Sequence, residues 1–165
     1  MFTKILLPTD GSDAAEQAAR QGVELAKSVG AQVIGVCILA ESHSERGHQE
    51  LARSTASGYT VSGEPSPQPP PLAENADEDN DRAAAISERY LAGIRSAAED
   101  AGVQCRCVYR ISDDVAEALV NIANEQRCDL IIMASHGLGG FKRLVVGSQT
   151  YKVLTHSSVP VLVWR

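Results

Sequence analysis

The chain has 165 residues, of which 44% are hydrophobic, and carries a formal net charge of −6. This length fits one domain, residues 1–165, that buries most of its apolar surface without disulfide or metal cross-links. The negative charge argues against a nucleic-acid partner, because general nucleic-acid binding depends on Lys and Arg residues that contact phosphates.

The positive charge gathers towards the end of the sequence. No Asp or Glu follows Asp129, whereas Lys142, Arg143, Lys152 and Arg165 all lie beyond it. A local excess of positive charge attracts anions. This part of the chain therefore suits a small anionic ligand.

The first apolar run, in MFTKILLPTDGSD, ends at Pro8 after only a few residues. It is too short for the core of a signal peptide or for a membrane span. We therefore expect a cytoplasmic protein that does not insert into a membrane.

The four cysteines do not have the spacing of a zinc site, which would pair Cys or His residues two to four apart at two places. Cys105 and Cys107 lie two apart in a strand-like run, so their side chains are expected on one face. We expect all four cysteines to pack in the core as small hydrophobic residues.

The chain opens with a strand and a helix. The apolar run KILLP at 4–8 predicts a buried strand. An Ala-rich helical pattern follows at 13–29, in which Asp13 and Glu16 have the spacing of a capping box. Gly30 is expected to end this helix.

The apolar run QVIGVCIL at 32–39 predicts a second strand, after which the regular pattern stops. Residues 41–81 show no sustained period, hold five of the seven prolines between Pro65 and Pro71, and finish in the acidic run ENADEDND. Such a composition is typical of a mobile insertion or lid.

Helices and strands alternate again after this segment. Gly102 is expected to end the first helix, and Asp114 with Glu117 has capping-box spacing at the start of the second. The expected elements are a helix at 82–101, a strand at 103–110, a helix at 113–126, a strand at 129–135, a helix at 148–156 and a strand at 159–164.

This alternation predicts the α/β class, with a single doubly wound open sheet of about five parallel strands and helices on both faces, as in Rossmann-like folds. Ligands of such sheets bind beyond the carboxyl ends of the strands, where the winding reverses. Polar or Gly-rich segments follow two strands, at Asp10 and at Ser135 to Gly140. If these two strands are neighbours, both loops open into one crevice.

The stretch LIIMASHGLGGFKRLVVGSQTYKVLTH, residues 130–156, contains the Gly-rich loop. It lacks the G-x4-G-K-[ST] of a P-loop, and Lys142 stands where a Rossmann fingerprint needs its third glycine. Pro8 stands where a phosphatase of the haloacid dehalogenase type has its nucleophile. Ser135 next to His136 lacks the G-x-S-x-G of many hydrolases, so we identify no catalytic residue.

The remaining interpretation of this loop is a cradle of backbone amides. Gly137 allows the chain to approach a phosphate closely, and Gly147 with Ser148 opens a helix whose free N–H groups attract an anion. The residues alone leave a second interpretation open, in which the glycines make a tight turn and Ser148 is only an N-cap.

The segments KILLPTDGS, LIIMASHGLGGFKRLVVGS and SSVPVLVW together resemble the universal stress protein family, over residues 1–40 and 82–165. The ATP-binding branch of this family has G-x2-G-x9-G-[ST] after its fourth strand. Here Gly137, Gly147 and Ser148 fit that motif, whereas Ala134 replaces the first glycine. Alanine adds one methyl group and still offers its N–H, provided that its backbone torsions are ordinary.

The resemblance implies a site for ATP or another adenine nucleotide, with Mg²⁺ bridging the phosphates. Asp10 would meet the adenosine end, the backbone at Ile38 would meet the adenine edge, and the Gly-rich loop would hold the phosphates. No residue is assigned as a metal ligand. The implied nucleotide-binding residues are Pro8, Thr9, Asp10, Ile38, Met133, Ala134, Gly137, Gly147, Ser148, Gln149 and Thr150.

Several of these residues also have a purely structural interpretation. Asp10 could cap the turn into the first helix, and Ile38 could simply pack in the core. Lys142 and Arg143 either stay solvated or close over the phosphates.

The family also forms dimers through its last strand, which implies a homodimer through residues 159–164. The apolar run VPVLVW would be an aggregation hazard if its edge were left bare. The expected function is that of a dimeric, ATP-binding regulatory protein of the stress response. The alternatives are a dimeric interaction protein that binds no nucleotide, and a very slow ATPase or autophosphorylating switch.

Overall fold

The computed structural model describes residues 1–40, 76–135 and 146–165, without side chains at 76–80. Most of the predicted insertion at 41–81 lies outside the described residues, as do Gly137, Lys142 and Arg143. No helix in the described part of the chain is long and apolar enough to cross a membrane.

The strands form one parallel sheet of five strands in the order β3-β2-β1-β4-β5. This confirms the predicted parallel α/β architecture. The strands are β1 (Lys4–Thr9), β2 (Gln32–Leu39), β3 (Cys105–Ile111), β4 (Leu130–Ala134) and β5 (Val161–Trp164).

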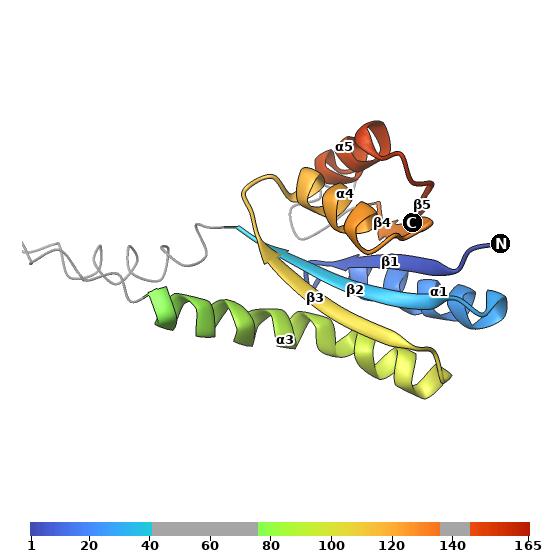
Figure 1. Cartoon of the computed structure of the whole chain (residues 1–165), viewed down its shortest axis with the longest axis horizontal. Coiled ribbons are helices and arrows are strands. Elements are labelled where there is room, and N and C mark those ends of the chain that lie inside the picture. The colour runs from blue at the N-terminus through green and yellow to red at the C-terminus, as the bar shows by residue number, and fades with distance from the viewer. Residues whose placement is uncertain (41–75, 136–145) are drawn as a thin grey trace, which may run out of the picture.

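Helices cover both faces of the sheet, as the sequence predicts (Figure 1). In the view of Figure 1, α3 lies below the sheet and α1 lies behind it, whereas α4 and α5 lie above it. The helices are α1 (Asp13–Val29), α3 (Ala76–Ala101), α4 (Val115–Glu125) and α5 (Ser148–His156).

Each face of the sheet has its own apolar core, because successive side chains of a strand point to opposite faces. Ile5 and Leu7 of β1 pack in the core beneath α1 and α3. Leu6, between them, packs in the core beneath α4 and α5. All three side chains are fully buried. The near-continuous apolar runs read in the sequence therefore reflect strands that are covered on both sides.

The winding of the sheet reverses at β1, which lies between β2 and β4. The pairing of β1 with β2 continues to Thr9 and Cys37, whereas its pairing with β4 stops at Leu6 and Ile131. Pro8 has no N–H to donate, which suits a position beyond the end of that ladder. The strands β1 and β4 thus lose their pairing towards their carboxyl ends, at the point where this fold class binds ligands.

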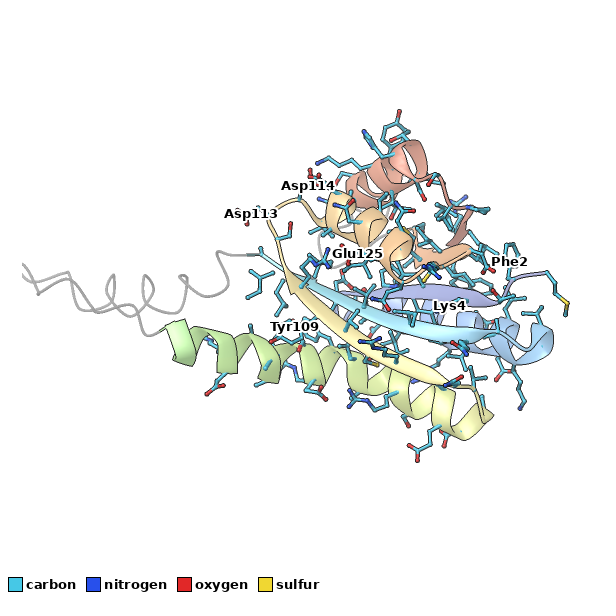
Figure 2. All side chains as sticks on the ribbon, in the orientation of Figure 1. Phe2, Lys4, Tyr109, Asp113, Asp114 and Glu125 are labelled. Carbon is cyan, nitrogen blue, oxygen red and sulfur yellow. The ribbon has the colours of Figure 1, made fainter. Side chains whose placement is uncertain are left out.

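Figure 2 shows the amino ends and the carboxyl ends of the parallel strands at opposite sides of the sheet. Phe2 and Lys4 lie at the amino end of β1, whereas Asp113 and Asp114, which follow β3, lie at the opposite end of the molecule. Because all strands are parallel, Asp10 after β1 and Ser135 after β4 lie at the same end of the sheet as Asp113 and Asp114.

The ends of α1 differ in part from the prediction. Its N-cap is Ser12, whose side chain accepts a hydrogen bond from the Ala15 amide, so the predicted capping box of Asp13 and Glu16 is wrong. Ser12 has the extended backbone of an N-cap, which leaves Asp13 as the first helical residue. The helix ends as predicted at Gly30, whose φ of 71° is left-handed.

The other predicted caps are present. Asp114 is the N-cap of α4, and its carboxylate accepts from the amide of Glu117 at 3.1 Å. Gly102, with a φ of 70°, follows the end of α3. The start of α3 differs, since this helix begins at Ala76 and not at 82. Its first turns contain the acidic run that the prediction gave to the insertion, and acidic side chains are favourable near a helix N-terminus.

All four cysteines contact the apolar cores, as predicted, but only two of them are fully buried. Cys37 and Cys128 are buried, but Cys105 and Cys107 on the edge strand β3 are only partly buried. The edge strand lacks a neighbour on one side, so its side chains are less completely covered.

Candidate functional site

The turn after β1 is held by its own side chains. The amide of Gly11 donates to the Thr9 hydroxyl at 3.1 Å, and the amide of Ser12 donates to Oδ1 of Asp10 at 3.0 Å. Asp10 therefore does hold the turn into α1, which was one of the two roles expected of it. Because one of its carboxylate oxygens makes this bond, the side chain is fixed beside the carboxyl end of β1.

The Asp10 carboxylate lies close to the end of β2 as well. Burial raises the pKa of the Cys37 thiol to about 11, and the nearby negative charge of Asp10 adds to this rise. Cys37 pairs with Thr9 across the two strands. Ile38 follows Cys37 and packs against the core beneath α4 and α5, so its side chain has the structural role that was expected as an alternative. Its backbone lies at the same edge as Asp10.

Gly11 lies against the ring of Tyr90 from α3. A Cβ at Gly11 would lie 2.5 Å from Cδ1 of Tyr90, and the φ of Gly11 is +77°. Both facts require glycine at this position. No motif in the sequence marks Tyr90, whose ring holds the turn after β1 against α3.

The second loop of the site joins β4 to α5. The amide of Gly147 donates to the carbonyl of Ser135 at 2.7 Å. The hydroxyl of Thr150 donates to the carbonyl of Ala134 at 3.0 Å. These two bonds bring the first turn of α5 to the end of β4, so Ala134, Gly147 and Thr150 lie together.

The N-terminus of α5 has no side-chain cap. Gly147 is its N-cap, with φ −67° and ψ 156°, and no side chain makes a cap hydrogen bond there among the residues described. The expectation that Ser148 could be the N-cap is wrong, because Ser148 is the first residue of the helix. Ser148 and Gln149 are exposed. A helix start of this kind presents backbone N–H groups and the positive end of the helix dipole to an anion.

Two of the predicted nucleotide-binding residues, Thr150 and Met133, have side chains that are already engaged or buried. Thr150 is 4% exposed and its hydroxyl bonds Ala134, so the amide is the group that Thr150 can offer to a ligand. Met133 is 7% exposed and packs beneath α4 and α5. The side chain of Met133 therefore belongs to the apolar core and offers no polar contact to a ligand.

Ala134, which replaces the first glycine of the motif, has an ordinary backbone. Among the non-glycine residues of the described ranges, only Arg127 has a positive φ. The condition under which alanine could serve at this position is therefore met. Gly137, the second glycine, lies outside the described residues.

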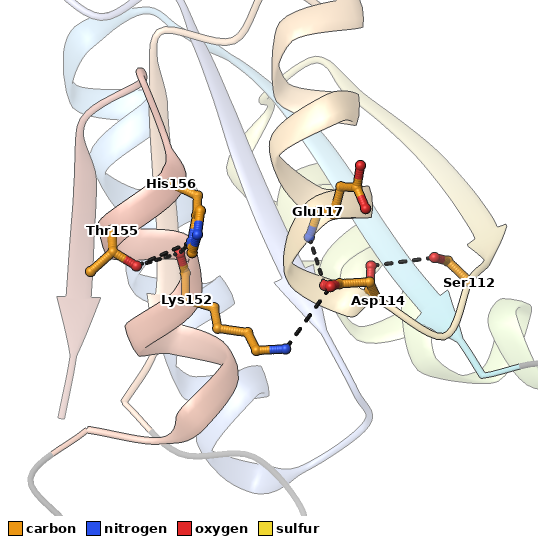
Figure 3. Close-up of polar contacts among 6 residues, drawn as sticks. All are labelled: Ser112, Asp114, Glu117, Lys152, Thr155 and His156. Atoms are coloured by element: carbon orange, nitrogen blue, oxygen red, sulfur yellow. Dashed lines mark hydrogen bonds and ion pairs between the residues drawn. The ribbon is translucent and has the colours of Figure 1, made fainter.

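A charged pair links α4 to α5 at the same edge (Figure 3). Nζ of Lys152 lies 3.9 Å from Oδ2 of Asp114, and both side chains are about half exposed. The hydrogen bond from the Glu117 amide, with a smaller contribution from Lys152, holds the pKa of Asp114 below its ordinary value. An exposed pair of this kind adds little stability. It does place Lys152, one of the positively charged residues that follow Asp129, near the carboxyl ends of the strands.

The whole chain, residues 1–165, matches the model of the universal stress protein family. The universal stress protein YxiE of Bacillus subtilis is 29% identical over 165 residues and covers 100% of both chains. A universal stress protein of Thermus aquaticus is 30% identical over 165 residues, again with 100% of both chains covered.

Solved structures give the same result. The structure of MJ0577, a universal stress protein of Methanocaldococcus jannaschii, has a TM-score of 0.68 at 25% identity, and the match covers 99% of this chain and 95% of that one. A universal stress protein in complex with cAMP has a TM-score of 0.61 at 19% identity, with 99% and 97% covered. One from Archaeoglobus fulgidus in complex with dAMP has a TM-score of 0.54 at 15% identity, with 100% and 98% covered. The last two likenesses show the fold alone.

The order of the strands and the match over the full length agree with one another. The chain belongs to the universal stress protein family.

Proposed function

We propose that this protein binds ATP or another adenine nucleotide at the carboxyl edge between β1 and β4, and that occupancy of this site regulates its part in the stress response. The observation that carries the proposal is the uncapped N-terminus of α5, which is tied directly to the end of β4. Two family members that share the fold were solved with cAMP and dAMP, which is consistent with an adenine nucleotide here.

The phosphates would lie against the amides of Gly147, Ser148, Gln149 and Thr150. Mg²⁺ would accompany the nucleotide and be coordinated mainly by phosphate oxygens and water, as suits this ion. Ala134 and Gly137 would complete the cradle on the β4 side.

The adenosine end would lie beside Pro8, Thr9 and Asp10, with the backbone of Ile38 next to the adenine edge. A carboxylate accepts hydrogen bonds only, so Asp10 suits the hydroxyl groups of a ribose. One oxygen of Asp10 accepts from Ser12, and each carboxylate has about four lone-pair sites in all. Holding the turn and contacting a ribose are therefore compatible roles.

We further propose that the protein works as a homodimer through residues 159–164, since β5 is an edge strand of the sheet.

Its four cysteines are free thiols, as is usual in a reducing compartment such as the cytoplasm.

Calorimetry with Mg²⁺ and ATP tests the phosphate site, with two substitutions of nearly equal size at Ser148. Ser148→Asn keeps the site neutral and should retain binding. Ser148→Asp places a negative charge at the helix start and should weaken ATP binding about tenfold or more, which corresponds to about 1.4 kcal/mol. The same Asp should slightly stabilise the unliganded helix, since acids are favourable there.

Opposite effects on stability and on binding separate a lost ligand contact from simple misfolding. The absence of heat from the wild-type protein with ATP, ADP and AMP would contradict the proposal and favour a dimeric interaction protein without nucleotide. Equal affinities of the Ser148→Asp and Ser148→Asn variants would place the phosphates elsewhere.

A pair of substitutions at Asp10 tests the adenosine end. Asp10→Asn keeps an oxygen that can accept from the Ser12 amide but removes the charge, whereas Asp10→Ala removes both. If Asp10 only holds the turn, the Asn variant binds nucleotide as the wild type does. If Asp10 also contacts the nucleotide, both variants lose affinity.

A further inference from the structure

Cys105 and Cys107 lie side by side on the edge strand β3. Their Sγ atoms are 3.9 Å apart and both thiols point towards the face covered by α3. Both residues are only partly buried. The other two cysteines, Cys37 and Cys128, are 0% and 6% exposed.

The space for Cys107 is created by a glycine on the neighbouring strand. Gly35 of β2 pairs with Cys107, and a Cβ at Gly35 would lie 3.2 Å from the Cys107 Sγ. The same Cβ would also lie 3.2 Å from Cγ2 of Ile94 on α3. The thiol of Cys107 therefore occupies a place that any larger residue at position 35 would take.

The charged groups that act on the thiols come from α3. Arg95 pairs with Glu88 at 2.7 Å, and both side chains are about half exposed. The hydrogen bond from Cys105 and then the positive charge of Arg95 lower the pKa of Cys107 to about 7, while burial and the charge of Glu88 act in the opposite direction.

The pKa of the neighbouring thiol, Cys105, shifts in the opposite direction. Its hydrogen bond to Cys107, together with burial, raises the pKa of Cys105. Arg95 acts on Cys107 through a hydrogen bond and its charge but on Cys105 through its charge alone, so we infer that Cys107 is the thiol that ionises first. A thiolate next to a resolving thiol is the arrangement found in redox-sensitive cysteine pairs.

We propose that Cys105 and Cys107 form a redox-active thiol pair, which a hydroperoxide oxidises to an intrachain disulfide. In the first step, the Cys107 thiolate attacks the terminal oxygen of the hydroperoxide. An S–O bond forms and the O–O bond breaks, which gives a sulfenic acid at Cys107 and an alcohol or water after protonation.

In the second step, Cys105 loses its proton and its sulfur attacks the sulfur of Cys107. The S–S bond forms, the S–O bond breaks, and hydroxide leaves and takes up the proton as water. In sum, two thiols lose two electrons and two protons, and one hydroperoxide is reduced by two electrons.

Strand geometry makes this disulfide easy to reduce. Two residues along a strand have Cα atoms about 6.6 Å apart, near the upper end of the disulfide range of about 4.4–6.8 Å. Closing the bond must therefore bend β3. A strained disulfide has a higher reduction potential than an unstrained one and is more easily reduced. As an edge strand, β3 is paired only with β2, which allows such bending. The pair is suited to reversible oxidation.

The test treats the full-length protein with one equivalent of hydrogen peroxide and measures intact mass and alkylation of each cysteine. We expect the wild type to lose the mass of two hydrogens, to protect Cys105 and Cys107 from alkylation, and to recover with dithiothreitol. In Cys105→Ser, Cys107 should remain as a sulfenic acid that dimedone traps. In Cys107→Ser, Cys105 should not react.

The buried cysteines are the internal control, since burial raises the pKa of both Cys37 and Cys128 to about 11. Oxidation of Cys105 and Cys107 no faster than that of these two would overturn the proposal. A disulfide that joins two chains in place of one, or dimedone labelling of Cys105 in Cys107→Ser, would overturn it as well.

Arg95 is a positioning residue, and its role is tested by the pH profile of alkylation. In Arg95→Gln, half-maximal reaction of Cys107 with iodoacetamide should move to higher pH, so that the reaction at pH 7 slows several-fold. Arg95→Lys should restore much of the wild-type profile. An unchanged profile in Arg95→Gln would remove Arg95 from the proposal.

Discussion

The Thr150 hydroxyl donates a hydrogen bond of 3.0 Å to the carbonyl oxygen of Ala134, sixteen residues earlier in the chain. Both residues are buried, at 4% and 8% exposure. This bond joins the first turn of α5 to the end of β4. The proposed phosphate cradle therefore depends on a contact that touches no ligand itself.

Replacing Thr150 by Val should destabilise the protein by about 1–3 kcal/mol, because the shape is kept while the buried carbonyl of Ala134 loses its donor. The free energy of unfolding from urea titration measures this loss. Thr150→Ser keeps the hydroxyl and loses one methyl group, so it should cost about 1 kcal/mol or less. A Val variant as stable as the Ser variant would show that the bond is unimportant.

Gly11 and Gly30 can be compared directly, because both have a positive φ. Only at Gly11 would an added Cβ meet another side chain. A Cβ at Gly11 would meet the ring of Tyr90 at 2.5 Å, whereas a Cβ at Gly30 would meet nothing within 4 Å. Gly30→Ala should cost about 1 kcal/mol from backbone strain alone. Gly11→Ala should cost clearly more and should also weaken nucleotide binding, by moving Asp10.

Thermal melts and ATP titrations of both variants check this prediction. Equal losses of stability for the two Ala variants would mean that Tyr90 moves aside freely. In that case, the turn after β1 would not be fixed by α3.

Asp129 should make the stability of the protein depend on pH. Its carboxylate accepts from the amide and hydroxyl of Thr3, at 2.8 and 2.7 Å, and from the amide of Lys4 at 3.0 Å. Burial acts to raise the pKa of Asp129, but these hydrogen bonds outweigh it and the pKa lies below its ordinary value. A carboxylate with a lowered pKa contributes stability above its unfolded pKa of about 3.9 and loses it as the pH falls through the folded value.

Asp129→Asn should therefore be less stable than the wild type at pH 7, and the difference should shrink below about pH 4. Urea titrations at pH 7, 5 and 3 measure this. Asp100→Asn, at an exposed position of α3, is the control and should show little difference at any of these pH values. A constant gap between Asp129→Asn and the wild type would contradict the prediction.

The edge of β5 offers a direct test of the homodimer. The carbonyls of Pro160 and Trp164 accept from β4, so the alternating residues Val161 and Val163 direct their backbone groups to the free edge. Val163→Pro removes an edge donor and leaves the β4 ladder intact. It should convert the proposed dimer to a monomer in sedimentation velocity, with the fold kept by circular dichroism.

Leu162→Pro is the contrasting variant, because Leu162 directs its backbone groups towards β4. It should destabilise the monomer itself. A wild-type protein that sediments as a monomer, or a Val163→Pro variant that stays dimeric, would exclude dimerisation through this edge.

The sequence was sufficient to predict the parallel sheet, the helices on both faces and most element boundaries to within two residues, because buried strands and amphipathic helices leave strong periodic patterns. The sequence also predicts that Asp10 and the start of α5 lie at the same end of the sheet, because the carboxyl ends of parallel strands lie together. The N-cap Ser12 directly precedes the Ala-rich run, but Asp13 and Glu16 next to it have the same capping-box spacing, so the spacing alone does not identify the cap.

Other features depend on tertiary contacts that no local pattern encodes. Tyr90 lies 79 positions after Gly11, and only the packing of α3 against the turn brings them together. The exposure of Cys105 and Cys107 depends on β3 being an edge strand, which is a property of strand order. The bond between Thr150 and Ala134 likewise requires the position of α5 to be known.

The place of β1 in the sheet has a consequence for how the chain folds as it is made. Thr3 contacts Asp129, 126 residues later, and β1 cannot pair with β4 until that part has been synthesised. At ordinary translation speeds, the intervening residues take on the order of ten seconds to appear. During that time β1 of the nascent chain has no partner on its β4 side, and Leu6 is not yet covered by α4 and α5.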